Sequence, residues 1–177
     1  MIYSIGHSNR TLAAFLSLLQ MNEIAALVDI RQFTRSRANP QFNADSLAPD
    51  LAKHGIAYRH VKELGGRRGS KLKPSPNGLW ENESFRNYAD YALEDEFEVG
   101  LEQLLHLVGQ RSVAMMCAEA VWWRCHRRIV IDYLLTRDHA VRHILGESEP
   151  KAATVTPGAE VRSDGKVLYP PREPLLL

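Results

Sequence analysis

The chain has 177 residues, 45% of them hydrophobic and 24% charged, which is ordinary for one globular domain with a real core. With a formal net charge of only +1, the protein as a whole is not expected to attract nucleic acid or membranes electrostatically. No apolar run is long enough to span a bilayer. The start of the chain lacks the pattern of a signal peptide, and two cysteines cannot build a disulfide framework, so we expect a cytoplasmic protein with reduced thiols.

Five short apolar runs that are typical of strands alternate with helical patterns along the chain. The strands are expected at residues 2–5, 24–30, 56–61, 112–116 and 140–144. Apolar residues at helical spacing predict helices at about 12–19, 45–54, 84–108 and 124–136. Thr11 and Ser84 are the expected N-caps of the first and third helices. This alternation predicts a three-layer α/β fold, with a mostly parallel sheet of about five strands and helices on both faces.

The composition changes after Gly146, which divides the chain into two parts. We expect a single α/β domain over residues 1–146 and an extended or weakly ordered tail over 147–177, where Pro, Ser, Thr, Lys and Glu predominate. Within the tail, residues 163–166 (Ser-Asp-Gly-Lys) predict a hairpin turn between two short strands. The acidic run from Glu81 to Glu102 is interpreted as the solvated start of a helix.

Polar groups follow four of the predicted strands, and the loops at the opposite edge carry nothing comparable. They are His7 and Ser8 after the first strand, Arg31, Arg35 and Arg37 after the second, Arg59, His60, Arg67 and Arg68 at and after the third, and Cys117, Glu119, Arg124, Cys125, His126, Arg127 and Arg128 after the fourth. Ligands of open parallel sheets bind beyond the carboxyl ends of the strands. The sequence therefore predicts an anion-binding site at this edge.

The two cysteines are the candidate reactive groups. Cys117 ends a strand before a loop and a helix, the layout of thiol enzymes that cradle an anion on backbone N–H groups. Six residues separate Cys117 from Arg124, whereas phosphate loops of that kind have five, and a buried cysteine that only fills space is the alternative. Cys125 is expected at a helix N-terminus, where the pKa of a thiol falls.

The neighbours of the cysteines have more than one expected role. Adjacent residues of a helix do not share a face, so no dyad of Cys125 with His126 is expected, whereas Arg128 can share the side of Cys125. Glu119 is either a general base or an ion-pair partner of Arg31 or Arg127. His7 is a candidate proton donor. Arg31 and Arg37 suit an anion, the alternative being surface charge or pairing with Asp29 and Glu63.

Further alternatives stay open at this point. A metal site could draw on Cys117, Cys125, His7 and His60, but the spacing matches no standard motif, so no metal or other cofactor is expected. A regulatory disulfide between the two cysteines is conceivable. Trp122 and Trp123 could stack on a base or cover a pocket, or they could pack in a core or a subunit contact.

Taken together, the motifs resemble the bacterial and archaeal family called domain of unknown function 488. The motifs are Gly6-His7-Ser8, Val28-Asp29-Ile30-Arg31, Ser36-Arg37, Glu63-Leu64-Gly65-Gly66, Phe85 with Tyr88 and Tyr91, Met116-Cys117-Ala118-Glu119 and Cys125-His126-Arg127. The resemblance covers about residues 1–146 and implies a Rossmann-like domain of unassigned activity, with a loose label of DNA repair on some members. Carried over by motif, its site positions are His7, Ser8, Asp29, Arg31, Arg37, Cys117, Glu119, Cys125, His126 and Arg127. The Trp122-Trp123 pair departs from the more polar residues of relatives.

The leading hypothesis is a thiol-dependent enzyme that acts on an anionic, phosphate-bearing or nucleotide-like small molecule. Cys117 would be the nucleophile, Glu119 or His7 the proton-transfer group, and Cys125 an assisting thiol. Binding of the substrate would fall to Ser8, Arg31, Arg37, His126 and Arg127. One alternative is a nucleic-acid-binding or DNA-repair module whose phosphate contacts are Arg67, Arg68, Lys71 and Lys73. A second alternative is a metal-binding protein; no membrane partner is expected, and a homodimer is left open.

Overall fold

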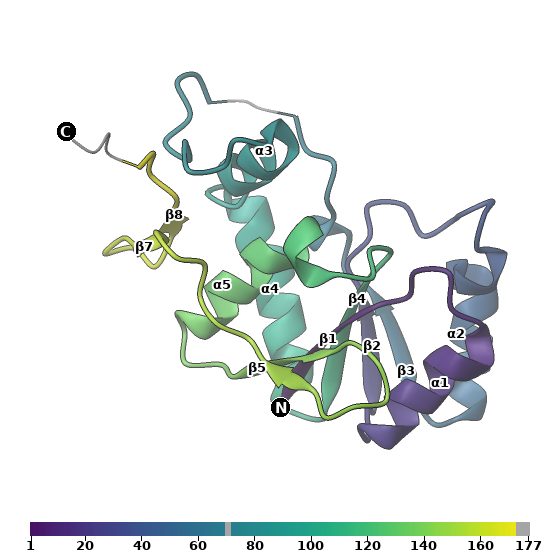
Figure 1. Ribbon diagram of the computed structural model, residues 1–177. Helices are drawn as coiled ribbons and strands as arrows, with labels where there is room; N and C mark the ends of the chain where they lie inside the picture. The colour runs from purple at the N-terminus through teal and green to yellow at the C-terminus, as the bar shows by residue number, and fades with distance from the viewer. Residues whose placement is uncertain (70–71, 173–177) are drawn as a thin grey trace.

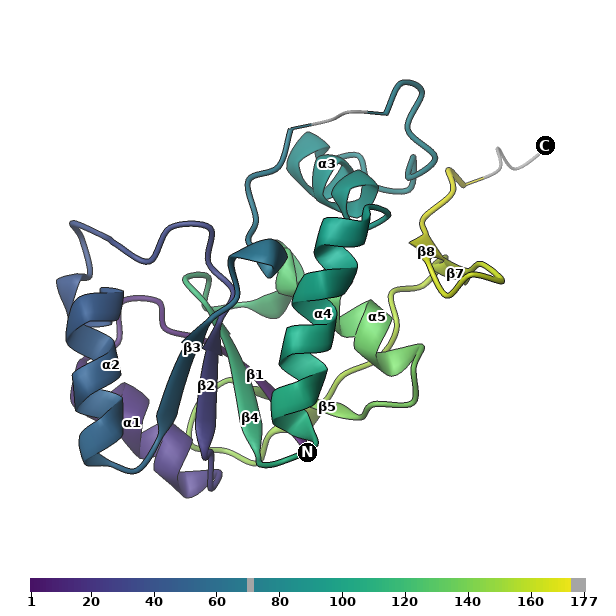
Figure 2. The same ribbon diagram turned by 180° about the vertical axis from the view of Figure 1, so that it is seen from behind.

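A computed structural model describes residues 1–69 and 72–172, and these residues form a six-stranded mixed sheet with helices on both faces and a separate two-stranded sheet (Figures 1 and 2). The strands are β1 (Ile2–Gly6), β2 (Ala26–Asp29), β3 (Ala57–His60), β4 (Val113–Cys117), β5 (Val141–Ile144) and β6 (Lys151–Ala152), in the spatial order β3-β2-β4-β1-β5-β6. The first five are parallel, as predicted, and β6 runs antiparallel to β5. The adjacent interior strands β2 and β4 are buried throughout, which explains their largely apolar sequences.

The sheet is the middle layer, and two hydrophobic clusters join it to a layer of helices on each face. The helices are α1 (Leu12–Met21), α2 (Ala44–Lys53), α3 (Glu83–Tyr91), α4 (Asp95–Val108) and α5 (Arg127–Leu135). Helices α1 and α2 cover one face, where Phe15 and Leu19 pack with Ile5 of β1, and α4 and α5 cover the other (Figure 2). The predicted three-layer, Rossmann-like α/β fold is confirmed.

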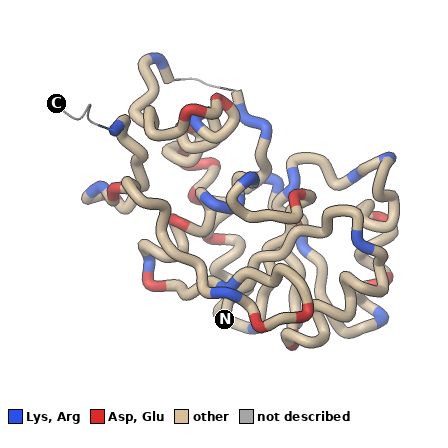
Figure 3. Tube along the Cα trace, viewed as in Figure 1, with Lys and Arg blue, Asp and Glu red and all other residues tan. Residues whose placement is uncertain are grey.

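Local capping explains where the helices begin, and it corrects two expectations. Ala14 donates its N–H to Thr11 Oγ1 at 3.2 Å, so Thr11 is the predicted N-cap of α1. Ser84 is not the cap of α3, because the Asn82 side chain accepts the N–H groups of Ser84 and Phe85 instead. The single helix expected over 84–108 is two helices, α3 and α4. The acidic run does begin a solvated helix, with three carboxylates in the first turn of α4 (Figure 3).

The last helix begins three residues later than expected, and this shapes the site. Residues Trp122–Arg124 form a 3-10 turn, Cys125 is extended, and α5 begins at Arg127 with His126 as its N-cap residue. Gly6 lets this segment lie directly on β1, because a Cβ there would overlap the carbonyl oxygen of Glu119. The close approach holds the cysteine-bearing segment over the carboxyl end of β1.

The segment after Gly146, for which an extended or weakly ordered tail was expected, packs against the domain in the residues that the structure describes. The predicted hairpin is confirmed by the antiparallel pair β7 (Glu160–Val161) and β8 (Val167–Leu168). Tyr169 is fully buried and donates its hydroxyl to Asp132 Oδ2 at 2.8 Å, while the Thr156 N–H binds Oδ1. The boundary placed at residue 146 stays a prediction. None of the helices in the described ranges combines the length and apolarity that a bilayer crossing requires.

Candidate functional site

A pocket of about 750 Å³ opens at the carboxyl edge of the sheet, where the sequence predicts a binding site. Its walls come from the segments that follow β1, β2, β3 and β4 and from the start of α3. The residues concerned are His7, Ser8, Asn9, Arg31, Gln32, Phe33, Arg35, Ser36, Asn39, Gly66, Arg67, Ser84, Phe85, Tyr88, Cys117, Ala118, Glu119, Arg124, Cys125 and His126. Loops that are far apart in the chain thus meet around one hollow, which is the size of pocket that small-molecule ligands occupy.

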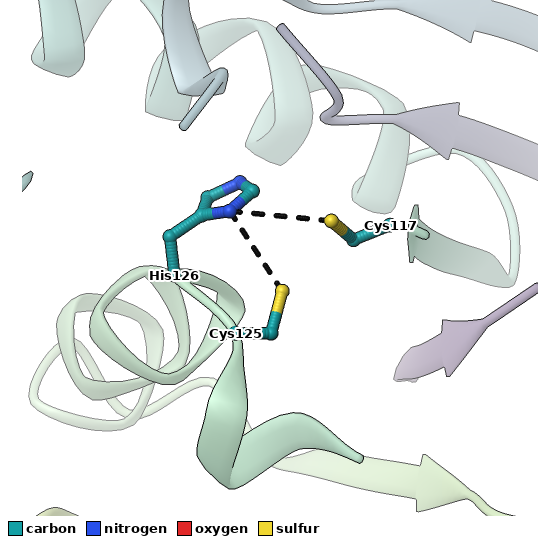
Figure 4. Close-up of side chains that lie close together, drawn as sticks. All are labelled: Cys117, Cys125 and His126. Carbon is teal, nitrogen blue, oxygen red and sulfur yellow. Dashed lines mark hydrogen bonds between the residues drawn. The ribbon is translucent and has the colours of Figure 1, made fainter. Parts of the chain in front are cut away.

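Two free thiols and one imidazole meet in this pocket (Figure 4). His126 Nδ1 lies 3.7 Å from Cys125 Sγ and 4.0 Å from Cys117 Sγ. The two cysteines are only 3% and 7% exposed, and both contribute to the pocket lining. The three donor atoms all lie within 4.8 Å of one another. We call these three residues the thiol–imidazole cluster.

The contact of Cys125 with His126 contradicts the expectation that adjacent residues would point apart. That expectation assumed a helix at both positions, but Cys125 has an extended backbone, with φ −130° and ψ 145°. Helix α5 begins only at Arg127, with His126 as its N-cap residue, so Cys125 and His126 are not successive residues of one helix. The two side chains therefore share one side of the chain at the entry to α5.

The His126 ring is held in one orientation by its surroundings. Its Nε2 lies 3.0 Å from the carbonyl oxygen of Ile30, which can only accept, so Nε2 carries the hydrogen and Nδ1 presents a lone pair to the sulfurs. The Tyr88 ring lies 4.8 Å away, and its hydroxyl donates to Leu64 O. A Cβ at Gly66 would lie 2.8 Å from Nδ1, so glycine makes room for the ring.

The pKa values of the two thiols are shifted in opposite directions. Burial raises the pKa of Cys125, but a hydrogen bond from Cys117, the charge of Arg127 and the Arg127 N–H, 3.5 Å from Sγ, outweigh it and lower the pKa. The pKa of Cys117 is raised, because it is hydrogen-bonded to the Cys125 sulfur and buried. Cys117 therefore retains its proton while Cys125 is the sulfur that ionises more easily.

Arg31 is anchored beneath the pocket by a buried carboxylate. Its guanidinium meets Asp29 with Nη2 to Oδ2 at 2.6 Å, and Tyr58 donates to the same oxygen. Burial opposes the charge of Arg31, but the hydrogen bonds and charge of Asp29 outweigh it and raise its pKa. The pairing with Asp29, one alternative of the sequence analysis, is confirmed. Because Nη1 still reaches His7 Nε2 at 3.2 Å, Arg31 remains part of the pocket wall.

His7 is neutral in this arrangement. Burial and the nearby charge of Arg31 lower the pKa of His7 to about 4, against the hydrogen bond between its Nδ1 and the carbonyl oxygen of Ser8. Nδ1 therefore carries the hydrogen, and Nε2 accepts from Arg31. The ring stacks on Phe42 at 4.3 Å. At neutral pH, the group that His7 presents towards Arg31 is an acceptor.

The other predicted site residues are divided between the pocket and its surroundings. Ser8 and Glu119 line it, whereas Arg37 is exposed and outside the lining. Arg127 is 1% exposed and lies behind the pocket, where Nη2 donates to the backbone carbonyl of Glu119 at 2.7 Å. Among the described residues, no ion pair joins the Glu119 carboxylate to Arg31 or Arg127; the link to Arg127 runs through the backbone.

Several residues that were predicted to lie beside the cysteines or over the pocket lie elsewhere in the structure. His7 and His60 do not join the cysteines; His60 Nε2 meets the carbonyl oxygen of Arg31 at 2.9 Å. Arg128 does not face Cys125 but lies over the Trp80 ring at 4.9 Å and donates to Thr156. Neither tryptophan of the 3-10 turn lines the pocket. Trp122 stacks on His143, with ring centroids 4.6 Å apart, and Trp123 is half exposed beside it.

The proposed phosphate contacts of a nucleic-acid module also separate. Arg67 lines the pocket, but Arg68 donates to the carbonyls of Gly65 and Lys62 and lies 3.8 Å from the Tyr91 ring. Arg68 thereby holds the loop after β3 in place. Lys73 is exposed, and Lys71 lies outside the described residues. The nucleic-acid alternative stays a prediction.

The sequence pattern gave no binding role to several residues of the pocket lining, among them Arg124, Phe33 and Phe85. Arg124 lies in the lining, and it was passed over because its spacing from Cys117 did not fit a phosphate loop. Phe33 is 63% exposed, with the Arg67 guanidinium 5.8 Å from its ring. Phe85 reaches the pocket from α3. An aromatic residue beside arginines in the loop after a buried strand was the available signal for Phe33.

The fold and this edge define the class of protein: an open α/β domain with a thiol-bearing pocket beyond its parallel strands. The chain belongs to the family described as domain of unknown function DUF488, whose sequence profile matches residues 11–134. The match includes both cysteines and His126, whereas the Gly6-His7-Ser8 motif lies before its first residue. Neither a curated protein nor a solved structure shows a significant match to the chain.

Proposed function

We propose that the protein is a thiol-dependent enzyme that acts on an anionic, phosphate-bearing or nucleotide-like substrate in this pocket. One observation carries the proposal: two free thiols and the lone pair of an imidazole meet where arginines form the wall. Among the described residues, the arginines that line the pocket are Arg31, Arg35, Arg67 and Arg124. Guanidinium groups bind phosphate and carboxylate oxygens through paired hydrogen bonds, and the thiol–imidazole cluster supplies a nucleophile beside its base.

In this proposal the nucleophile is Cys125, although the sequence alone favoured Cys117, and three contacts of Cys125 support the change. Cys125 Sγ receives the Arg127 N–H at the start of α5, where the helix dipole and the guanidinium favour a negative charge. His126 Nδ1 is within reach to take the thiol proton. Cys117 then stabilises the neighbouring sulfur by hydrogen bonding, a supporting role.

The reaction that fits these groups is a displacement in two steps. The Cys125 sulfur forms a bond to the electrophilic atom of the substrate, and the bond to the leaving group breaks; the leaving group departs with the electron pair and takes the proton held by His126. Water then attacks the sulfur-bound group and gives a proton to His126, and the Cys125 thiolate departs. The sum is hydrolysis of the substrate, with the enzyme regenerated.

The pocket wall favours a substrate that combines a negative charge with a flat ring. Phe33 exposes its ring to solvent next to Arg67, and Phe85 stacks on Trp80 with ring centroids 5.1 Å apart. Aromatic faces next to guanidinium groups bind the rings and phosphates of nucleotides. This arrangement supports the nucleotide-like branch of the proposal.

Paired alkylating reagents test the thiolate and the cationic wall together. The full chain is treated with anionic iodoacetate and with neutral iodoacetamide, and the rates are compared with those of a free thiol by intact-mass measurement. We expect the iodoacetate rate, relative to that of iodoacetamide, to exceed the free-thiol ratio by about tenfold. Cys125→Ser should remove the fast modification, and inorganic phosphate or AMP should slow it.

Two arginine variants provide the matched control. Arg124→Gln removes a charge from the pocket lining and should reduce the preference for iodoacetate. Arg111→Gln removes an exposed charge next to the start of β4, at the opposite edge of the sheet, and should leave it unchanged. Thiols that neither reagent modifies in the folded chain, or a modification rate that phosphate and AMP leave unaltered, would rule the proposal out.

A further inference from the structure

The thiol–imidazole cluster has a second chemical capacity, which does not depend on the proposed function. Cys117, Cys125 and His126 are its members, and thiolate sulfur with imidazole nitrogen is the donor set that zinc prefers in proteins. The geometry points to a binding site for a thiophilic divalent cation, Zn²⁺, held by both sulfurs and His126 Nδ1 at the floor of the pocket.

The distances between the donors fit a tetrahedral ion. Zinc–sulfur bonds of about 2.3 Å and zinc–nitrogen bonds of about 2.05 Å at tetrahedral angles place sulfur and nitrogen about 3.6 Å apart, and two sulfurs about 3.8 Å apart. His126 Nδ1 lies 3.7 Å from one sulfur and 4.0 Å from the other, and no two donors are more than 4.8 Å apart. A change of at most about 1 Å in the separation of any two donors would therefore complete three of the four ligand positions.

The orientation of His126 is independent support for the site. Imidazole ligands usually donate their other ring N–H to a carboxylate or a carbonyl, which fixes the tautomer and turns the lone pair to the metal. The Ile30 carbonyl oxygen accepts a hydrogen bond from His126 Nε2 at 3.0 Å, and Nδ1 faces both sulfurs (Figure 4). The ring could not sit here with a side chain at position 66, because a Cβ on Gly66 would contact it.

Two features set the character of the site. Two thiolates neutralise a dication, so the arginines nearby face a site of no net charge once the thiol protons are released. The protein supplies three ligands from the described residues, and all three line the pocket, so the fourth position faces the space in which a small molecule binds. Three protein ligands with one open position are the arrangement of catalytic, not structural, zinc sites.

Metal binding and nucleophilic attack by Cys125 exclude each other, because both use the lone pairs of the same sulfur. A bound ion would therefore protect the thiols from alkylation. The two proposals can be tested separately. Binding of the ion is measured by the visible absorption of bound Co²⁺, whereas the thiolate function is measured by alkylation of the metal-free chain.

Cobalt(II), a spectroscopic substitute for zinc, tests the site in the unaltered full chain. Metal-free protein is titrated with Co²⁺, and we expect one equivalent to produce thiolate-to-cobalt absorption with the strong visible bands of a tetrahedral complex. Zn²⁺ should then displace the cobalt and bleach these bands. A chain that gives no thiolate-to-cobalt absorption overturns the inference, and this result requires no variant to fold.

Variants test which side chains bind the ion. His126→Ala, Cys117→Ser and Cys125→Ser should each weaken Zn²⁺ binding by more than about 100-fold, which exceeds the usual effect of losing a ligand's supporting hydrogen bond. His106→Gln is the matched control, since His106 is exposed on α4 and meets the Gln110 side chain. Circular dichroism confirms that each variant is folded. Affinity that survives all three cluster substitutions would place the ion elsewhere and refute the assignment.

Discussion

The buried carboxylate beneath the pocket gives the sharpest prediction about stability. Asp29 is fully buried and accepts the backbone N–H of Arg31 at 3.0 Å and its Nη2 at 2.6 Å, as well as the Tyr58 hydroxyl at 2.7 Å. Asp29→Asn keeps the shape but removes the charge and turns an amide NH₂ towards these donors. The Arg31 guanidinium, 5% exposed, would lose the only carboxylate that pairs with it among the described residues.

Breaking a buried ion pair by removing one partner costs about 3–5 kcal/mol, because the remaining charge is left uncompensated in the interior. The whole domain is expected to be stable by only about 5–15 kcal/mol. In a domain of this size each kcal/mol moves the melting temperature by about 2–4 °C, so Asp29→Asn should lower it by about 6–20 °C. Thermal and urea unfolding at pH 7, followed by far-UV circular dichroism, measure the loss.

Asp45→Asn is the matched control, because it breaks a carboxylate–arginine pair of similar length at the surface. Arg35 Nη2 lies 2.8 Å from Asp45 Oδ2, but the two side chains are 79% and 57% exposed. Such pairs contribute about 0–1 kcal/mol. If Asp29→Asn is no more destabilising than Asp45→Asn, burial does not decide the strength of the Asp29–Arg31 pair, and the reasoning fails.

Three further substitutions probe other parts of the fold. Hydrogen bonds from Arg137 lower the pKa of Glu98 in the folded chain, so the stabilisation they provide is present above the ordinary glutamate pKa of about 4.3 and is lost as the pH falls through the lower folded pKa. The difference in urea midpoint between the native chain and Glu98→Gln should therefore shrink over that pH range. A difference that does not change with pH would contradict this. Gly6→Ala forces a Cβ into the Glu119 carbonyl and should cost about 1–3 kcal/mol in urea unfolding, whereas an unchanged midpoint would mean that the cysteine-bearing loop yields freely. Tyr169→Phe deprives a buried carboxylate of α5 of one donor and should cost about 1–3 kcal/mol, and a neutral result would show that the tail does not secure the domain.

Repetitive patterns carried most of the fold prediction. The apolar runs at 24–30 and 112–116 indicate strands buried on both faces, and β2 and β4 are adjacent interior strands of the sheet. Alternation with helical spacing then dictates parallel order, and parallel order brings the strand ends to one edge. The cap of α3 was misplaced because Ser84 and Asn82 are both good capping residues, and the choice between them depends on backbone geometry.

The site was predicted as a place but not as an arrangement of atoms. Local spacing could not bring His126 to the sulfurs, because the pattern extended the helix back to Arg124 and hid the extended residue at Cys125. Nor could it show that Arg37 would lie outside the pocket while Arg124 lines it, since a residue's position in a loop says little about where its side chain ends.

By itself, then, the amino-acid sequence determined the parallel α/β architecture, the edge of the sheet at which the candidate site lies and the two cysteines that belong to it. These follow from periodic burial, which acts residue by residue along each element. Only the tertiary structure decided that the Ile30 carbonyl turns the lone pair of His126 towards both sulfurs, and that Asp29 holds Arg31 under the pocket. The reason is that Ile30 and His126 are 96 positions apart in the chain and meet only through packing. Even the neighbouring pairs, Cys125 with His126 and Asp29 with Arg31, depend on how packing turns their side chains, for which no local pattern exists.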